Sequence, residues 1–324
     1  MSVLVLLDHT PDGALRAPVR ELLTLARDIA GADVHAAWPA SGAEPTEETV
    51  AELGAMGVGH VHRLVADADL RLSAVVATGL ASLVGAIGAD LVLALSTFEN
   101  KEVAARLAVA TGAGVVTDAD ALTVEDGRYV AGKTVFAGTW TTRCAVTTPL
   151  AIVLVKANSV VAYPAEDAVP VAIDDHAFQA DDAARRVRLV ERTERPASGR
   201  PDLASAHVVV AGGRGTEGDF SAVEELADVL GAAVGATRVA TDEGWIGHDA
   251  QIGQTGVTIS PRLYIGAGIS GAVHHRGGMQ ASGTIVAINS DPDAPIFEIA
   301  DFGVVGDLFQ VLPQAAAELR ARKG

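Results

Sequence analysis

Short apolar runs, each ending in glycine or polar residues, recur along the chain and constrain its fold more than any other feature. The clearest are residues 3–7, 91–95, 207–211, 263–267 and 284–288. Segments with helical spacing of apolar residues, such as 18–30 and 220–230, lie between them, and Ser221 and Glu224 predict a capping box at the start of the latter. Buried strands that alternate with helices are typical of parallel sheets with crossover helices. The pattern therefore predicts an α/β fold.

The length of 324 residues predicts two domains, since a domain usually contains ~100–200 residues. Residues 195–201 contain two prolines on either side of a Ser-Gly pair, which is typical of a connector. We therefore predict an N-terminal α/β domain over 1–196, a linker over 197–204 and a second α/β domain over 205–324.

The first predicted domain changes character at about residue 121, where the helical patterns give way to hairpins. Asp126-Gly127 is a typical two-residue turn between antiparallel strands. Further strands are predicted at residues 134–136, 142–146 and 152–155. The N-terminal domain is thus expected to combine a parallel sheet with a β-hairpin-rich portion.

Composition excludes several classes of protein. The formal net charge of −17 argues against binding to phosphate backbones or anionic membranes. A single cysteine, Cys144, cannot form an internal disulfide, a CxxC pair or a multi-thiolate metal site, so redox chemistry would require a cofactor. The uncharged run 72–89 is better explained by a buried helix than by a membrane span. Residues 1–8 contain no basic n-region, and their apolar run is too short for a signal peptide, so we expect a cytoplasmic protein.

Ligands of open parallel sheets usually bind outside the carboxyl ends of the strands. The first such turn is Gly212-Gly213-Arg214-Gly215, where glycines permit close approach to a ligand and the guanidinium suits a phosphate. A plain glycine turn with a solvated arginine explains these four letters equally well. A second turn, residues 266–271, matches GxGxxG, which favours a phosphate-bearing ligand more than it favours NAD itself.

A third cluster, residues 251–256, contains many side-chain hydrogen-bonding groups, and His274-His275 follow about twenty residues later. Adjacent histidines cannot easily share one metal ion, and no acidic residue lies nearby at ligand spacing, so a metal site is not expected. GxSxG, Walker and HExxH motifs are absent from the sequence. The residues alone therefore predict a two-domain α/β protein that binds a phosphate-bearing cofactor in its second half.

An ordered series of motifs in the second half resembles the electron transfer flavoprotein α subunit family. They are residues 233–238, 253–256, 263–265, 268–272, 285–289, 293–297 and 303–309. The first half resembles the family's N-terminal domain more loosely, through residues 4–9 and 100–106. The resemblance implies a doubly wound FAD-binding second domain. It also implies a heterodimer whose β subunit carries AMP.

Members of this family pass electrons from acyl-CoA dehydrogenases to a quinone reductase, so the resemblance implies an electron carrier rather than an enzyme that turns over a substrate. It implies the following FAD-binding residues: Arg214, Thr237, Arg238, Ile252, Gly253, Gln254, Thr255, Ser270, Gly271, Ala272, Val273, His274, His275, Asn289, Asp307 and Leu308. Three of them are expected to tune the flavin: Arg238 as a nearby cation, Thr255 as a hydrogen-bond partner of N5 and His275 as a donor on the O2 side.

The sequence departs from the family pattern at a few positions. Val257, Gly283 and Ser290 stand where relatives commonly carry lysine, and Gly266 is not part of the family motif. Within the family, a fatty-acid or amino-acid oxidation role, a nitrogen-fixation-type role and a bifurcating role remain open. Outside it, the alternatives are an NAD-dependent oxidoreductase of similar fold and a nucleotide-binding module without redox activity.

Overall fold

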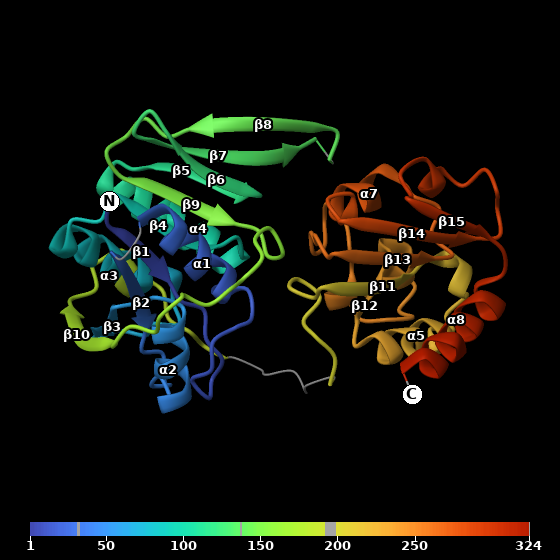
Figure 1. Cartoon of the computed structure of the whole chain (residues 1–324), viewed down its shortest axis with the longest axis horizontal. Coiled ribbons are helices and arrows are strands. Elements are labelled where there is room, and N and C mark those ends of the chain that lie inside the picture. The colour runs from blue at the N-terminus through green and yellow to red at the C-terminus, as the bar shows by residue number, and fades with distance from the viewer. Residues whose placement is uncertain (31–32, 137, 192–198, 324) are drawn as a thin grey trace. The chain divides into compact units, whose positions relative to one another are not determined.

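The computed structural model describes residues 1–30, 33–136, 138–191 and 199–323. These residues form two compact units, shown in Figure 1. The first comprises Met1–Lys133 and Thr142–Glu194, and the second comprises Thr134–Thr141 and Arg195–Gly324. Residues 192–198 lie outside the described residues, and with them the first part of the predicted connector.

The first unit is built on a seven-stranded sheet in which every paired strand is parallel to its neighbour. The strands, in their spatial order, are β10 (Ala172–Phe178), β3 (His60–Ala66), β2 (Val34–Pro39), β1 (Val3–Leu6), β4 (Leu91–Leu95), β9 (Ala151–Val155) and β5 (Gly114–Ala119). Its helices are α1 (Val19–Ala30), α2 (Glu47–Ala55), α3 (Ser73–Ile87) and α4 (Phe98–Thr111). The predicted α/β class is confirmed.

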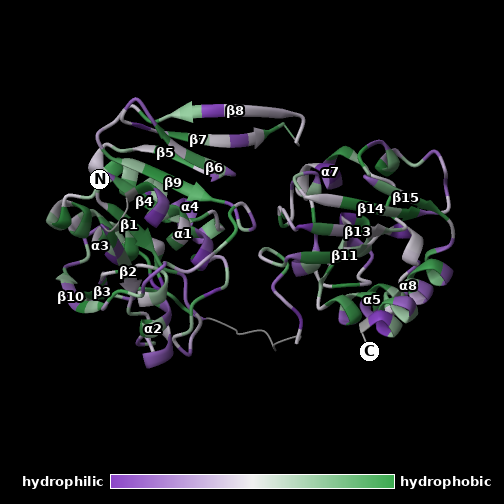
Figure 2. Ribbon diagram, in the orientation of Figure 1, coloured by the Kyte–Doolittle hydropathy of each residue, from purple (hydrophilic) through white to green (hydrophobic). Residues whose placement is uncertain are grey.

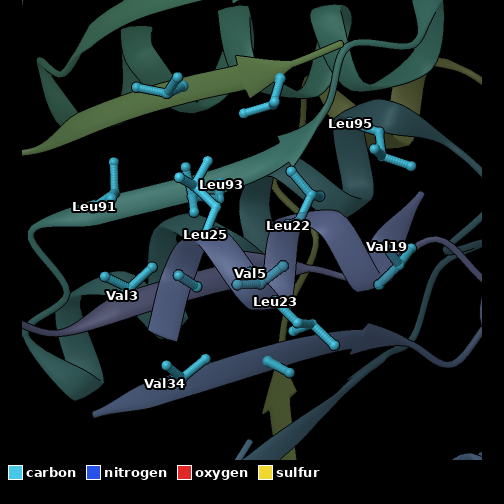
Figure 3. Packing of buried hydrophobic residues seen from close by; sticks show 14 of the residues in the cluster. Val3, Val5, Val19, Leu22, Leu23, Leu25, Val34, Leu91, Leu93 and Leu95 are labelled. Atoms are coloured by element: carbon cyan, nitrogen blue, oxygen red, sulfur yellow. The ribbon is translucent and has the colours of Figure 1, made fainter. Parts of the chain in front are cut away.

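Both faces of this sheet are covered by apolar side chains. On one face, Leu22 and Leu23 of α1 pack against Val5 of β1 and Leu93 of β4, as Figure 3 shows. On the other face, α3 and α4 contribute a separate cluster. Alternate side chains of a strand point to opposite faces, so the near-continuous apolar runs of β1 and β4 are explained by burial on both sides.

The uncharged run 72–89 forms α3, which buries residues such as Leu80 and Leu83 in the second of these clusters. Gly88 ends the helix in the left-handed conformation, with a φ of 66°. Among the helices of the described part of the chain, none is both long enough and apolar enough to cross a membrane. The expectation of a buried helix is therefore confirmed.

The predicted hairpin portion forms a three-stranded sheet of β6 (Ala121–Glu125), β7 (Arg128–Val135) and β8 (Trp140–Ala145). β6 and β7 are antiparallel and joined through Asp126 and Gly127, which have φ values of 49° and 73°. Positive φ at both central residues is what a type I′ turn requires. The strand predicted separately at 134–136 is the end of β7.

The second unit contains a five-stranded parallel sheet. Its strands, in spatial order, are β12 (Ala233–Ala236), β11 (Val208–Gly212), β13 (Leu263–Ala267), β14 (Thr284–Asn289) and β15 (Phe302–Val305). Its helices are α5 (Ser221–Leu230), α6 (Arg238–Asp242), α7 (Val273–Met279) and α8 (Leu308–Lys323). Figure 2 shows largely hydrophobic central strands, and helices α5 and α8 that carry hydrophilic residues on part of their surface.

The first strand of this unit, β11, lies inside the sheet, with β12 on one side and β13 on the other. The chain therefore leaves β11 toward one edge and later returns toward the other, which is the doubly wound arrangement. α5 and α8 bury one cluster against the sheet, and a second cluster includes Tyr264, Ile252 and Met279. The position between the carboxyl ends of β11 and β13 is the topological switch point.

The predicted capping box at the start of α5 is wrong. Ser221 is the first helical residue, and Phe220 occupies the N-cap without a side-chain cap bond. Asp219 takes over that function, because its Oδ1 accepts a hydrogen bond of 2.9 Å from the backbone N–H of Ser221. An aspartate just before the helix can satisfy a free N–H as well as a serine N-cap can, which explains why the spacing was misleading.

Candidate functional site

A cavity of about 790 Å³ opens at the switch point of the second unit. It falls within the 300–1,000 Å³ typical of cofactor sites. Turns that follow several strands of the sheet contribute its walls. The lining residues are Arg214, Gly215, Glu217, Thr237, Arg238, Val239, Gln251, Ile252, Gly253, Gln254, Thr255, Gly268, Ile269, Ser270, Ala272, His274, His275, Ile288, Asn289, Ser290, Asp291, Ala294, Pro295, Gly306, Asp307, Leu308 and Phe309.

Glycines allow the turns after β11 and β13 to approach each other at the base of this cavity. The backbone N–H of Gly215 donates to the carbonyl oxygen of Gly268 at 3.0 Å. A Cβ added to Gly213 would lie 2.5 Å from that same oxygen, and one added to Gly215 would lie 2.7 Å from the Cα of Gly268. Any side chain at these positions would push the turns apart. The two turns therefore offer a cofactor bare backbone.

Arg214 lies between these glycines in a short 3₁₀ segment, Arg214–Thr216, and its exposed side chain lines the cavity. A guanidinium at the end of a glycine turn can bind a phosphate through two parallel N–H groups. This position favours a ligand-binding function for Gly-Gly-Arg-Gly over the alternative of a turn with an unrelated surface arginine.

Thr237 follows β12 and has a buried hydroxyl oxygen with no hydrogen-bond partner within the part of the chain that the structure describes. The residue also lines the cavity. An unpaired buried hydroxyl is costly, so its retention at a cavity wall is a sign that a bound ligand supplies the partner. The next residue, Arg238, projects an exposed guanidinium that pairs with Asp242 one helical turn later, at 3.1 Å.

The loop between Gln251 and Val257 forms another wall and closes on itself. The N–H of Val257 donates to the carbonyl oxygen of Gln251 at 2.7 Å, and the N–H of Ile252 donates to Ala236 of β12 at 2.9 Å. Gln254 ties the loop to α7: its N–H donates to the carbonyl oxygen of His274, and its Oε1 lies 2.8 Å from Nδ1 of that histidine. Thr255 lies exposed in this loop.

His275 is buried beneath the same wall, with 6% of its surface exposed. Its Nδ1 lies 3.2 Å from the carbonyl oxygen of Ile252, which can only accept, so Nδ1 carries the proton. Nε2 is then an acceptor and lies 2.7 Å from the hydroxyl of Tyr264, which donates to it. Burial lowers the pKa of His275 to about 4 and raises the pKa of the fully buried Tyr264.

This arrangement bears on the donor role that the resemblance implies for His275. Both ring nitrogens are already hydrogen-bonded within the protein, and the ring is neutral at physiological pH. The imidazole therefore has no free N–H to give a flavin O2 in this geometry. A donor role requires the ring to give up its bond to Ile252 or to change tautomer.

Asn289 and Asp307, expected at the adenosine end, both line the cavity and also stabilise its walls. Asn289 lies at the end of β14, where its Nδ2 donates to the carbonyl oxygen of Ile269 at 2.9 Å and its Oδ1 accepts from the N–H of Asp291 at 3.0 Å. Asp307 precedes α8, and its Oδ1 accepts from the N–H of Phe309 at 2.9 Å. Their side chains thus hold three separate turns in place.

All the residues assigned by resemblance line the cavity except Gly271 and Val273. Gly271 is a turn residue with φ of +85°, and a Cβ there would lie 2.5 Å from the backbone nitrogen of Ile296. Val273 begins α7 with an exposed side chain. Position in a continuous motif did not distinguish these two from their neighbours, because alternate residues of a turn face different ways.

Several lining residues fall outside the predicted set. Val239, Ile269, Ser290, Gly306 and Phe309 directly adjoin residues that were predicted, and Gly268 and Asp291 lie one position further away, so the strand-end rule would have found them if applied more widely. Gln251 belongs to the polar cluster noted in the sequence. Glu217 had no signal in the sequence. As for metals, the described residues contain no group of three ligand-type side chains that could hold an ion.

A doubly wound domain with a cavity at its switch point and glycine turns at its base defines a protein of the nucleotide-cofactor-binding class. A family model described as an electron transfer flavoprotein domain matches residues 3–191, and one described as an electron transfer flavoprotein FAD-binding domain matches residues 202–280. The latter match covers the turns after β11, β12 and β13.

Similar proteins align with the whole chain. The electron transfer flavoprotein subunit alpha of Mycobacterium leprae is 42% identical over 325 residues, which cover 99% of both chains. Proteins of the same name from Syntrophomonas wolfei and Bacillus subtilis are 37% and 32% identical over 95% and 98% of this chain, and over 96% and 97% of their own lengths. The chain belongs to the electron transfer flavoprotein α subunit family, and its second unit carries that family's FAD-binding domain.

Proposed function

We propose that this protein is the FAD-carrying subunit of a heterodimeric electron transfer flavoprotein that accepts electrons from acyl-CoA dehydrogenase-type flavoproteins and passes them to a quinone reductase. The observation that carries the proposal is the cavity at the switch point, which collects the residues expected at FAD from turns far apart in the sequence. The unpaired hydroxyl of Thr237 and the bare glycine turns fit a large cofactor at this place.

The walls divide into regions with different chemistry. The Gly213–Gly215 turn and Arg214 suit the pyrophosphate, because glycines without side chains permit close approach and a guanidinium binds phosphate oxygens. Thr237, Arg238 and Thr255 suit the isoalloxazine ring, with Thr255 as the hydrogen-bond partner of N5. Bound FAD supplies the redox chemistry, so the protein needs no nucleophile or general base and contributes binding, orientation and electrostatics.

We further propose a cytoplasmic heterodimer with a β subunit that carries AMP, serving oxidation pathways such as fatty acid β-oxidation. A bifurcating or nitrogen-fixation-type system would use the same FAD-binding unit. An NAD-dependent oxidoreductase is not favoured. Gly266, the first glycine of the GxGxxG pattern, does not line the cavity. A Cβ added there would lie 2.9 Å from the ring of Tyr264, so this glycine makes room for a tyrosine of the protein rather than for a cofactor.

The test is to express the chain together with its β subunit, purify the complex and record its visible spectrum. We expect a flavin spectrum with one FAD per α subunit, bleached when an acyl-CoA dehydrogenase and its substrate are added. A colourless complex that takes up no FAD would refute the proposal.

A matched pair of variants tests the role of Arg238. Arg238→Ala is expected to keep FAD but lower its midpoint potential, because a nearby cation favours the more negative, reduced ring. Arg262→Ala removes an exposed arginine that does not line the cavity and should leave the potential unchanged. Equal potentials in the two variants would contradict the proposed role.

A further inference from the structure

Gln251 is buried at the back of the cavity wall and connects two threonines. Only 7% of its surface is exposed. One end of its amide, Oε1, lies 2.9 Å from the hydroxyl of Thr241 in α6. The other end, Nε2, lies 3.1 Å from the hydroxyl oxygen of Thr255, which lines the cavity. A buried amide is costly unless both ends are paired, so Gln251 is held in this bridge.

The hydrogen count of this bridge permits two arrangements. The hydroxyl of Thr241 also lies 2.9 Å from the carbonyl oxygen of Arg238. In the first arrangement Nε2 of Gln251 donates to Thr255, whose own hydrogen is left for the cavity. Thr241 then has one hydrogen for two oxygens, Oε1 of Gln251 and the Arg238 carbonyl.

Rotation of the Gln251 amide by about half a turn produces the second arrangement, since its oxygen and nitrogen are nearly equal in size. Nε2 now donates to Thr241, Thr241 donates to Arg238, and Thr255 donates to the amide oxygen. Thr255 then presents a lone pair to the cavity. Neither arrangement breaks the loop, because its backbone is fixed by separate bonds from Ile252 to Ala236 and from Val257 to Gln251.

We infer that Gln251 is a positioning residue that directs the hydroxyl of Thr255 and lets it act as either donor or acceptor toward the bound cofactor. The inference rests on the proposed function, in which Thr255 faces flavin N5. That nitrogen is an acceptor in the oxidised ring and carries a hydrogen in the fully reduced ring, so one threonine can match both forms only if its hydroxyl can reverse.

The test compares two cofactors in the heterodimer stripped of flavin. FAD has an acceptor at position 5, whereas 5-deaza-FAD has a C–H there. The measured quantity is the ratio of the dissociation constants of the two cofactors. Contacts to the rest of the cofactor contribute equally to both constants and therefore cancel. One net hydrogen bond corresponds to about a two- to tenfold preference for FAD. Three single variants are compared with wild type: Gln251→Met, Gln251→Glu and Thr255→Val. A double variant combines Gln251→Met with Thr255→Val. The matched control is Gln314→Met, on the exposed side of α8.

We expect the wild type and Gln314→Met to prefer FAD, and Gln251→Met to lose that preference as completely as Thr255→Val, with no further loss in the double variant. The nearly isosteric Gln251→Glu, whose carboxylate only accepts, should bind FAD but also lose the preference. A wild-type preference in either Gln251 variant overturns the inference while FAD binding upholds the proposed function. Failure of the wild-type complex to bind either flavin refutes both.

Discussion

Acid should destabilise the second unit through His275, and substitution of this residue should remove that sensitivity. The pKa of His275 is about 4 in the folded protein, against about 6.5 in an unfolded chain, because burial disfavours the imidazolium. Between these values the unfolded state binds the extra proton. Stability contributed by the neutral ring is therefore complete above pH 6.5 and is lost as the pH falls toward 4.

The magnitude follows from the size of the shift. Each pKa unit corresponds to about 1.4 kcal/mol, so this one histidine should lower the free energy of unfolding by about 2 kcal/mol between pH 7.5 and pH 5. His275→Gln should lower stability at pH 7.5, since it breaks the bonds to Tyr264 and Ile252. It should also flatten the pH dependence by those 2 kcal/mol.

The assay is urea unfolding followed by ¹⁹F NMR of 5-fluorotryptophan-labelled protein, in which the resonance of Trp245 reports on the second unit. The control is His207→Gln, in which the same substitution is made at an exposed histidine, and the quantity compared is the change in the free energy of unfolding with pH. Other titrating groups, including His62 in the first unit, contribute equally to both proteins. If His275→Gln and His207→Gln show the same loss of stability from pH 7.5 to pH 5, the buried neutral imidazole is not the source.

Three further predictions follow from other residues. Gly215→Ala should lower the free energy of unfolding by about 1–3 kcal/mol and reduce FAD content, because the added Cβ would lie 2.7 Å from the Cα of Gly268. Gly85→Ala is the control and should change neither quantity, since a Cβ added there would meet no other atom within 4 Å. Thermal unfolding measures the stability and flavin absorbance measures the FAD content. Thr237→Val should stabilise the FAD-free protein by about 1 kcal/mol, because it removes an unpaired buried hydroxyl, yet weaken FAD binding several-fold. A variant that is less stable without FAD, or that binds FAD as tightly as wild type, would contradict this reasoning. Burial raises the pKa of Asp8 to about 6, so its carboxylate destabilises the folded protein, and Asp8→Asn should be more stable than wild type by about 3 kcal/mol at pH 7. Urea midpoints should show this gain shrinking as the pH falls from 6 to 4, where the wild-type carboxyl protonates.

The strands that apolar runs predicted in the two parallel sheets are those buried on both faces. β13 spans Leu263–Ala267, as its apolar run predicts, and β4 spans Leu91–Leu95. Among the strands missed, which include β3, β12 and β15, β10 has the sequence AIDDHAF and is largely exposed. It has no apolar run to mark it, because it lies at the edge of its sheet and is held by parallel pairing with β3. Such pairing depends on register with a segment more than 100 residues away.

Some residues of the site could likewise be predicted from the sequence and others could not. Residues on glycine turns after strands could be predicted because the strand-end rule and the family motifs point to the same places. The bond between Tyr264 and His275 could not, since Tyr264 reads as an ordinary residue of an apolar strand and its partner follows in a separate helix. The direction in which a turn residue points, as for Val273, also depends on tertiary packing that local pattern does not encode.

The parallel pairing of β10 with β3 has a consequence for the order in which the chain can assemble during synthesis. The sheet of the first unit begins at Val3 but receives its last strand only with Ala172–Phe178, after the hairpin strands have been made. Until then β3 is an open edge on the growing polypeptide, and exposed edges are templates for pairing with other chains. A ribosome-bound fragment that stops short of residue 172 should therefore be the species most in need of a chaperone.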